Sequence, residues 1–208
     1  MIRLETEAGL WQVVIDRPEK ANSLTRAMLE DIDTLAARAA AEGARVFVLR
    51  GTGKVFSAGA DLDEARAGLA TADVWERLSG RIAALPCLTI AALNGTLAGG
   101  AFGMTLACDL RLAVSGANFF YPVMKLGFLP QPSDPKRMAA LIGPARAKMI
   151  LMAGARIGAE EARDWGLIER VVPDAAALDE AVAALATDAR NATPAHVAGI
   201  KALVTTAL

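Results

Sequence analysis

Two glycine-rich segments, residues 56–62 (FSAGADL) and 94–103 (NGTLAGGAFG), each follow an apolar stretch of strand type. The carboxyl ends of parallel strands face one crevice, so both segments can converge there, and their small side chains let the backbone approach a ligand closely. Two backbone N–H groups from separate loops, one at a helix N-terminus, can then form an oxyanion hole for a carbonyl oxygen. The alternative, which glycines alone favour, is that these segments only form turns.

Neither of two common nucleotide-binding loops fits the spacing. Residues 51–54 (GTGK) have the composition of a phosphate loop, but that loop needs a glycine five positions before its Gly-Lys pair and a Ser or Thr after it. Those positions hold Val48 and Val55. A dinucleotide fingerprint also fails, because Phe56 stands three residues after Gly53, and 95–103 has the wrong spacing.

Metal, redox and polyanion sites are disfavoured by the residue inventory. Cys87 and Cys108 lie in separate apolar runs, and His196 lies far from both, so the sequence has no clustered zinc ligands and no Cys-x-x-Cys pair. We expect two buried structural thiols and no metal. Lys and Arg total 22 against 23 Asp and Glu, a net charge of -1, so nothing favours binding to nucleic acid or an anionic membrane.

The 208 residues suffice for an independent hydrophobic core, and a hydrophobic content of 54% excludes a disordered chain. The start reaches an acidic residue at Glu5 without an apolar run, so we expect no secretory signal and a cytoplasmic protein. Residues 82–108 contain no charge and are long enough to cross a bilayer. Pro86 and the pairs at 94–95 and 99–100 interrupt this stretch, so it fits a buried strand followed by a buried helix.

The order of elements predicts an α/β fold. Strands are expected at 10–15, 46–49, 88–93 and 110–114, separated by helices at 25–41, 74–85 and 101–108. This alternation implies parallel strands with right-handed crossovers. After Pro144 the pattern turns helical, at 159–165, 175–189 and 194–208. We predict a single domain over 1–208, with a core at 1–142 and a helical part at 143–208.

With these motifs in order, the sequence strongly resembles the enoyl-CoA hydratase/isomerase family, the crotonase superfamily. The resemblance runs from about residue 10 to the end of the chain. The matching segments are 15–24 (IDRPEKANSL), 56–62, 93–110, Pro122, 126–127, 129–130, 159–162 and 165–168.

The resemblance implies a crotonase-like spiral of ββα units that binds an acyl-CoA thioester, with no cofactor beyond the coenzyme A of the substrate. The family's oxyanion hole is placed on the amides of Ala58 and Gly100. Arg17 and Lys20 are candidate phosphate contacts, with solvated turn charges as the alternative. The expected wall for adenine and pantetheine consists of Ala58, Gly59, Ala60, Asp61 and Leu62.

Two departures from the family pattern concern proton transfer. Hydratases of the family carry one glutamate three residues after the oxyanion glycine and another directly after the proline of the segment matching 120–127. Here those positions hold Gly103 and Val123, which cannot carry a proton, so classical hydration is disfavoured. Decarboxylation of a malonyl-type thioester forms an enolate without a base, so it stays open. The other hypothesis is a catalytically degenerate acyl-CoA-binding or assembly protein.

The resemblance places four polar residues in the segment that lines the family's acyl pocket: Tyr121, Gln131, Ser133 and Asp134, the only carboxylate among them. For Asp134 we favour a helix N-cap, because Pro135 follows it at a first helical position. Asp61 is likewise expected to cap a short helix or to orient its loop. The chain ends where family members usually continue into further helices, so it is expected to be shortened at the C-terminus. Its homo-oligomer, a trimer or hexamer in the family, is therefore less secure.

Overall fold

The main sheet confirms the four predicted strands and adds two. The computed structural model describes residues 1–206, and within them the main sheet runs in the order β1-β2-β3-β5-β7-β10. All neighbours pair in parallel except β1 and β2, which pair antiparallel. The strands are β1 (Ile2–Glu7), β2 (Leu10–Ile15), β3 (Val46–Gly51), β5 (Leu88–Leu93), β7 (Leu110–Val114) and β10 (Arg170–Val172).

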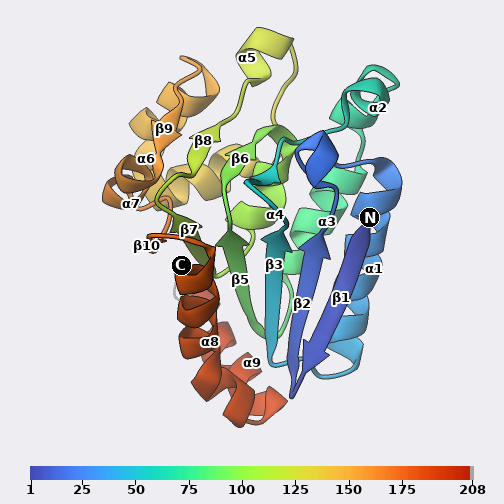
Figure 1. The fold of residues 1–208 in the computed structure, drawn as a ribbon, viewed down its shortest axis with the longest axis vertical. Coiled ribbons are helices and arrows are strands. Elements are labelled where there is room, and N and C mark those ends of the chain that lie inside the picture. Colours follow the sequence, from blue (N-terminus) through green and yellow to red (C-terminus); the bar gives the residue numbers. More distant parts are fainter. Residues whose placement is uncertain (207–208) are drawn as a thin grey trace.

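Helices cover both faces of this sheet (Figure 1). Helix α1 (Arg26–Ala41) begins after Thr25, whose hydroxyl oxygen accepts a hydrogen bond from the Met28 amide and so caps the helix. Its buried face packs with α3 (Val74–Ala83) in the larger hydrophobic cluster. On the other face, α8 (Ala175–Asn191) packs on β5 and β7. The parallel strands are therefore buried on both sides, which explains their continuous apolar runs.

A second sheet, in the order β4-β6-β8-β9, shows that the glycine-rich segments are not simple loops. Residues 51–59 and 94–100 were expected to be loops, but each contains a three-residue strand, too short to give an alternating pattern. The strands are β4 (Val55–Ser57), β6 (Thr96–Ala98), β8 (Asn118–Phe120) and β9 (Ile157–Gly158). The consecutive pairs β3–β4, β5–β6 and β7–β8 each place one strand in each sheet before a helix, which confirms the ββα spiral.

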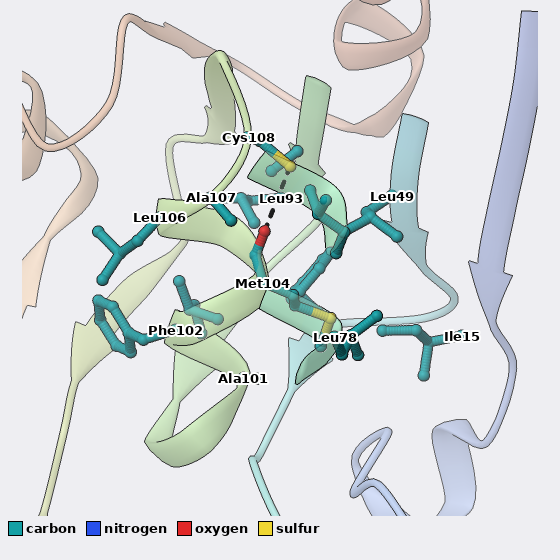
Figure 2. Close-up of a cluster of buried hydrophobic side chains, with 14 of the residues drawn as sticks. Ile15, Leu49, Leu78, Leu93, Ala101, Phe102, Met104, Leu106, Ala107 and Cys108 are labelled. Atoms are coloured by element: carbon teal, nitrogen blue, oxygen red, sulfur yellow. Dashed lines mark hydrogen bonds between the residues drawn. The ribbon is translucent and has the colours of Figure 1, made fainter. Parts of the chain in front are cut away.

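The short helix α4 (Phe102–Leu106) lies at the centre of the core (Figure 2). All five of its residues are buried, and their neighbours include Ile15, Leu49 and Leu78. The Cys108 thiol donates a hydrogen bond to the Met104 carbonyl at 3.3 Å. A helix this short is held by its packing and not by its propensity. Burial therefore fixes the 3-10 turn η3 (Gly99–Ala101) that leads into it.

The carboxyl-terminal part is helical, as predicted, but it also completes both sheets. Its helices are α6 (Asp134–Leu151), α7 (Ala159–Trp165), α8 and α9 (Pro194–Thr206). The expectation of helices alone is wrong, because β9 pairs with β8 and β10 pairs with β7. Helix α6 breaks at Gly143, where φ is 79°, and Pro144 starts its second half as expected.

The remaining elements are short and lie around the second sheet: α2 (Leu62–Arg66), α5 (Val123–Leu126) and the 3-10 turns η1 (Pro18–Lys20) and η2 (Leu69–Thr71). The uncharged stretch 82–108 is divided among α3, β5, β6 and α4. Among the helices of residues 1–206, none has the length and apolar character that crossing a bilayer requires. Cys87 and Cys108 are both buried and unbridged, which confirms the prediction of structural thiols.

Candidate active site

The first glycine-rich loop is clamped against the segment that follows η1. The Ala58 amide donates to the Ala21 carbonyl at 3.0 Å, and the Asp61 amide donates to the Leu24 carbonyl at 2.9 Å. In the opposite direction, the Leu24 amide donates to the Gly59 carbonyl at 2.8 Å. The loop is thereby paired with another segment like a short strand, and its orientation does not depend on its own side chains.

This pairing corrects the expected oxyanion donor. An amide has one hydrogen, and that of Ala58 is already given to Ala21, so it is not free to bind a substrate oxygen. The Gly59 amide donates to the Ser57 hydroxyl at 3.1 Å. Across 58–61, the Ala60 N–H alone forms no hydrogen bond with any described residue. The available donor in this loop is therefore Ala60, which the family resemblance places only in the coenzyme A wall.

The second loop brings the Gly100 amide to the same place. Gly100 lies in η3, and its N–H has no hydrogen-bond acceptor within the described part of the chain. A Cβ at Gly59 would lie 2.9 Å from the Ala98 carbonyl oxygen and 3.3 Å from the Gly100 nitrogen. The two loops therefore touch, and only glycine permits this approach because Gly59 also has a φ of +88°. On its other side, Gly100 abuts the ring of buried Trp75.

A cavity of about 120 Å³ lies where these loops meet. Its walls come from both loops, from α2 and α5, and from the segment between α5 and α6. The lining is mostly apolar, and its side chains with hydrogen-bonding groups are Tyr121, Gln131 and Trp75, whose indole N–H is already given to the Leu69 carbonyl. The lining includes Ala58, Ala60, Leu62, Gly99, Gly100, Val123, Phe128 and Leu129. This is a small apolar pocket with two free backbone donors, the arrangement that an oxyanion hole requires.

Positions 103 and 123 carry no acid, as the sequence shows, but the carboxylate of Asp134 lies beside Gly103. Val123 lines the cavity, and Gly103 is buried in α4. A Cβ at Gly103 would lie 2.9 Å from Oδ1 of Asp134, whose side chain is fully buried. The Tyr121 hydroxyl donates to Oδ2 of Asp134 at 2.9 Å, whereas Oδ1 has no hydrogen-bond partner among residues 1–206.

The expectation that Asp134 caps a helix is therefore wrong. The N-cap of α6 is Ser133, no side chain caps this helix, and the Asp134 carboxylate points to Tyr121. Burial raises the pKa of Asp134 to about 7, and it raises the pKa of the Tyr121 phenol far above its usual value. Tyr121 is therefore protonated at neutral pH. Gln131 reaches the cavity wall and donates from Nε2 to the Ala70 carbonyl at 3.3 Å.

The expected coenzyme A contacts divide into an organised pair and exposed groups. Arg17 donates to Oδ2 of Asp61 at 2.8 Å, and both side chains are largely buried, so Arg17 is not a solvated turn charge. The oxygen Oδ1 of Asp61 accepts from the amides of Asp63 and Glu64, which confirms its prediction as a cap of α2. The hydrogen bond from Arg17 is the main cause that lowers the Asp61 pKa.

Lys20 and Leu62 are both exposed at the surface beside these loops. Lys20 ends η1, and Leu62 begins α2 at the rim of the cavity. Their contacts with a phosphate or pantetheine remain predictions.

Two mixed sheets linked by repeated strand–strand–helix units define the crotonase fold. A solved structure of this kind, an enoyl-CoA hydratase from Bacillus anthracis, superposes with a TM-score of 0.90 at 32% identity, covering 98% of this chain and 82% of that one. The chain belongs to the enoyl-CoA hydratase/isomerase family, whose model matches residues 5–208.

Curated relatives include proteins named for different reactions. Enoyl-CoA isomerase/hydratase fer4 of Mycosarcoma maydis is 34% identical over 186 residues, 82% of this chain and 68% of that protein. 4-Chlorobenzoyl coenzyme A dehalogenase-1 of an Arthrobacter species is 32% identical over 184 residues, 84% of this chain and 67% of that protein. The alignments thus span about two thirds of these relatives.

Proposed function

We propose that this chain binds an acyl-CoA thioester and stabilises its enolate with the amides of Ala60 and Gly100. The observation that carries this proposal is the pair of unengaged N–H groups on touching loops beside an apolar cavity. Donors fixed in a dry pocket strengthen their bond to the oxygen as negative charge develops on it, and removing one such donor typically costs about 10²–10³ in kcat. The names of the relatives, which include two coenzyme A thioesters, support the substrate class.

The reaction that fits this site best is decarboxylation of a malonyl-type thioester. Breaking the bond from the α-carbon to the carboxylate releases carbon dioxide and leaves the electron pair as the enolate, so no base is needed to begin. Hydration needs a group that activates water, and Gly103 and Val123 offer none. The apolar wall formed by Val123 and Phe128 disfavours a charged carboxylate relative to neutral carbon dioxide. The small cavity favours a compact acyl group.

Coenzyme A binding is proposed along the rim. The strip Ala58, Gly59, Ala60, Asp61 and Leu62 would border the adenine and pantetheine, and exposed Lys20 would contact a phosphate. The Arg17–Asp61 ion pair would hold this strip in place, since it links the loop to η1. In this arrangement exposed Lys20 attracts the phosphate, and the Arg17–Asp61 pair orients the strip that borders coenzyme A.

We also propose that the chain forms a homo-oligomer, as a trimer or hexamer. An apolar groove between α5 and α6 is lined in part by Met124, Leu129 and Met152, all of them exposed. Exposed apolar patches of this kind favour contact with another protein surface. Light scattering during size-exclusion chromatography measures the assembly, and a monomer at micromolar concentration would contradict this proposal.

A panel assay tests the enzymatic proposal. Crotonyl-CoA hydration, double-bond isomerisation and decarboxylation of malonyl-CoA and methylmalonyl-CoA are measured alongside calorimetric binding of coenzyme A. We expect decarboxylation by the wild type and its loss in Gly100→Pro, which removes the N–H, with an unchanged circular dichroism spectrum. Binding without turnover of any thioester would instead support a catalytically degenerate acyl-CoA-binding protein, the alternative favoured by the missing glutamates.

A further inference from the structure

We infer that Asp134, acting through the Tyr121 hydroxyl, delivers and removes the proton at the substrate α-carbon, in the place of an acid on residue 103. This inference rests on the proposed function, because it supplies the proton that a thioester enolate needs in order to become product. It assigns Tyr121 as the catalytic residue, since Tyr121 lines the cavity, and Asp134 as the group behind it.

The first support is that the Asp134 side chain on α6 occupies the space that a side chain at position 103 on α4 would fill. Gly103 on α4 has no side chain, and Oδ1 of Asp134 on α6 lies 2.9 Å from the point that its Cβ would occupy. A glutamate at 103 would therefore collide with the carboxylate that is present. Asp134, on α6, places a carboxylate beside Gly103. Gly103 itself lies on α4, the helix that follows the turn containing Gly100.

The second support is the fixed path from this carboxylate to the cavity. The Tyr121 ring stacks on Phe102 with 5.4 Å between centroids and 11° between planes. Its hydroxyl donates to Oδ2 of Asp134 at 2.9 Å. These contacts hold the ring on the cavity wall that it shares with Gly100. Tyr121 therefore joins the cavity wall to the buried carboxylate.

The third support is the unsatisfied oxygen of Asp134. A carboxylate that serves only structure is normally hydrogen-bonded at both oxygens when it is buried, because an unpaired buried charge is costly. Oδ1 of Asp134 has no partner in the described part of the chain, although the side chain is completely buried. A group that alternates between protonated and charged forms fits this environment, because burial also raises its pKa to about 7.

The proton transfer balances as follows. After carbon dioxide leaves, the Tyr121 O–H proton moves to the α-carbon of the enolate and forms the new C–H bond. The phenol oxygen takes the proton of the Asp134 carboxylic acid, which becomes a carboxylate that accepts a hydrogen bond from Tyr121, as in the structure. In the reverse direction the Tyr121 oxygen takes the α-carbon proton of a saturated thioester, its own O–H proton passes to the Asp134 carboxylate, and the C–H electron pair becomes the enolate. Water then exchanges the carboxylic acid proton, and after decarboxylation a proton from water restores the carboxylic acid.

Charged groups around Asp134 should shift its pKa, and with it the pH midpoint of proton exchange. A purely structural role of Asp134 would give no such shift. Glu76 on α3 raises the pKa of Asp134, and Arg137 on α6 lowers it. Both side chains bond to the Ser133 hydroxyl, which donates to Glu76 at 3.0 Å and accepts from Arg137 at 2.8 Å. Together with Tyr121, they are the titratable groups that act on this carboxyl.

The test is hydrogen–deuterium exchange at the α-carbon of propionyl-CoA in D2O, measured against pH by mass spectrometry, beside malonyl-CoA decarboxylation. We expect the wild type to exchange with a midpoint near pH 7, and both Asp134→Asn and Tyr121→Phe to lose exchange at least a hundredfold. Decarboxylation should fall less than exchange, because its first step needs no base. Thermal melts of both variants verify that they fold.

Two charge variants sharpen the test. Glu76→Gln should move the midpoint of exchange to lower pH, and Arg137→Gln should move it to higher pH. Exchange by Asp134→Asn at the wild-type rate, or midpoints that do not move, would overturn this inference while decarboxylation continued. Absence of all thioester turnover in the wild type would overturn the proposed function, and the inference with it.

Discussion

The two sides of the cavity are built on different principles. On one side, the free amides of Ala60 and Gly100 come from loops held by backbone pairing and by the burial of α4. On the other side, Tyr121 and Asp134 are side chains whose arrangement depends on the absence of a side chain at Gly103. The geometry of the backbone side depends on residue identity mainly at its glycines, whereas the geometry of the other side depends on the side chains of Tyr121 and Asp134. Substitutions can therefore alter proton transfer by Tyr121 and Asp134 without altering the stabilisation of the enolate by the two amides.

The largest expected effect is that of Gly59→Ala, which should separate the two loops that carry the amides of Ala60 and Gly100. A Cβ there meets the Ala98 carbonyl oxygen at 2.9 Å, and the positive φ adds strain, so the loops should separate. We expect kcat for decarboxylation to fall by about 10²–10³, the loss associated with one oxyanion donor. Steady-state kinetics with malonyl-CoA measure it, with Gly68→Ala as a control at a positive-φ glycine that no other residue crowds. Equal effects in both variants would show that strain alone is responsible.

The side-chain side should make stability depend on pH. Asp134 has a folded pKa of about 7, well above the value near 4 of an unfolded aspartate, so the folded state binds more protons between these values. The contribution of Asp134 to stability is therefore greatest below pH 4 and is lost as the pH rises to 7, by an amount on the order of 4 kcal/mol. Urea unfolding from pH 4 to 8 measures the decline, which Asp134→Asn should remove. A variant that keeps the full decline would contradict this assignment.

Gly103→Ala probes the contact between α4 and α6. The added methyl group meets Oδ1 of Asp134, and such overpacking typically costs about 1–3 kcal/mol. In an Asp134→Ala background the same change should cost much less, because the crowding atom is gone. A double-mutant cycle by chemical unfolding measures the coupling. Additive free energies of unfolding would show that the two residues do not share this space.

A smaller effect is expected at the Arg17–Asp61 pair. Asp61→Ala removes both the cap of α2 and the ion pair, so unfolding should become easier by about 1 kcal/mol, near the usual value of an N-cap. Arg17→Met removes the ion pair and the hydrogen bonds from Arg17 to Ser23 but leaves the cap of α2 in place, so it should cost less. Both free energies come from urea denaturation. A larger loss in Arg17→Met than in Asp61→Ala would contradict a capping role.

The smallest effect is expected for Lys20→Ala. Exposed Lys20 would attract a coenzyme A phosphate through solvent, so KM should rise a few-fold with little change in kcat. The increase should shrink at high salt, because salt screens exposed charges. Glu19→Ala is a matched control on the same turn, and it should not raise KM. A fall in kcat without a change in KM would place Lys20 elsewhere in the mechanism.

Sequence reasoning reached the framework because short apolar runs bounded by turn residues, such as 88–93 between Pro86 and Asn94, are typical of buried parallel strands. It identified the loops that meet, since glycines that follow strands point to the same edge of a sheet. It missed β4 and β6 because three residues give no periodicity. It also chose Ala58 over Ala60, since only the pairing with Ala21 reveals which amide is already engaged.

Asp134 illustrates a local rule that tertiary structure overrides. An Asp-Pro pair at a helix start is typical of a cap, and nothing local indicates that the side chain turns inward instead. The available signal was indirect: the resemblance predicts an acid at position 103, where the chain has Gly103, and it predicts that the segment containing Asp134 lines the acyl pocket. Linking the two required the contact between α4 and α6, which connects residues 31 positions apart in the sequence.

The clamp between the Ala58 loop and the Ala21 segment has an evolutionary consequence. Because main-chain atoms form this pairing, mutations can alter the side chains at Ala58 and Ala60 while the direction of the amides stays the same. New residues at these sites would reshape the rim for another acyl group at little risk to the donors. A scaffold of this kind can acquire new reactions by substituting the side chains around the two backbone N–H groups while those groups keep their positions.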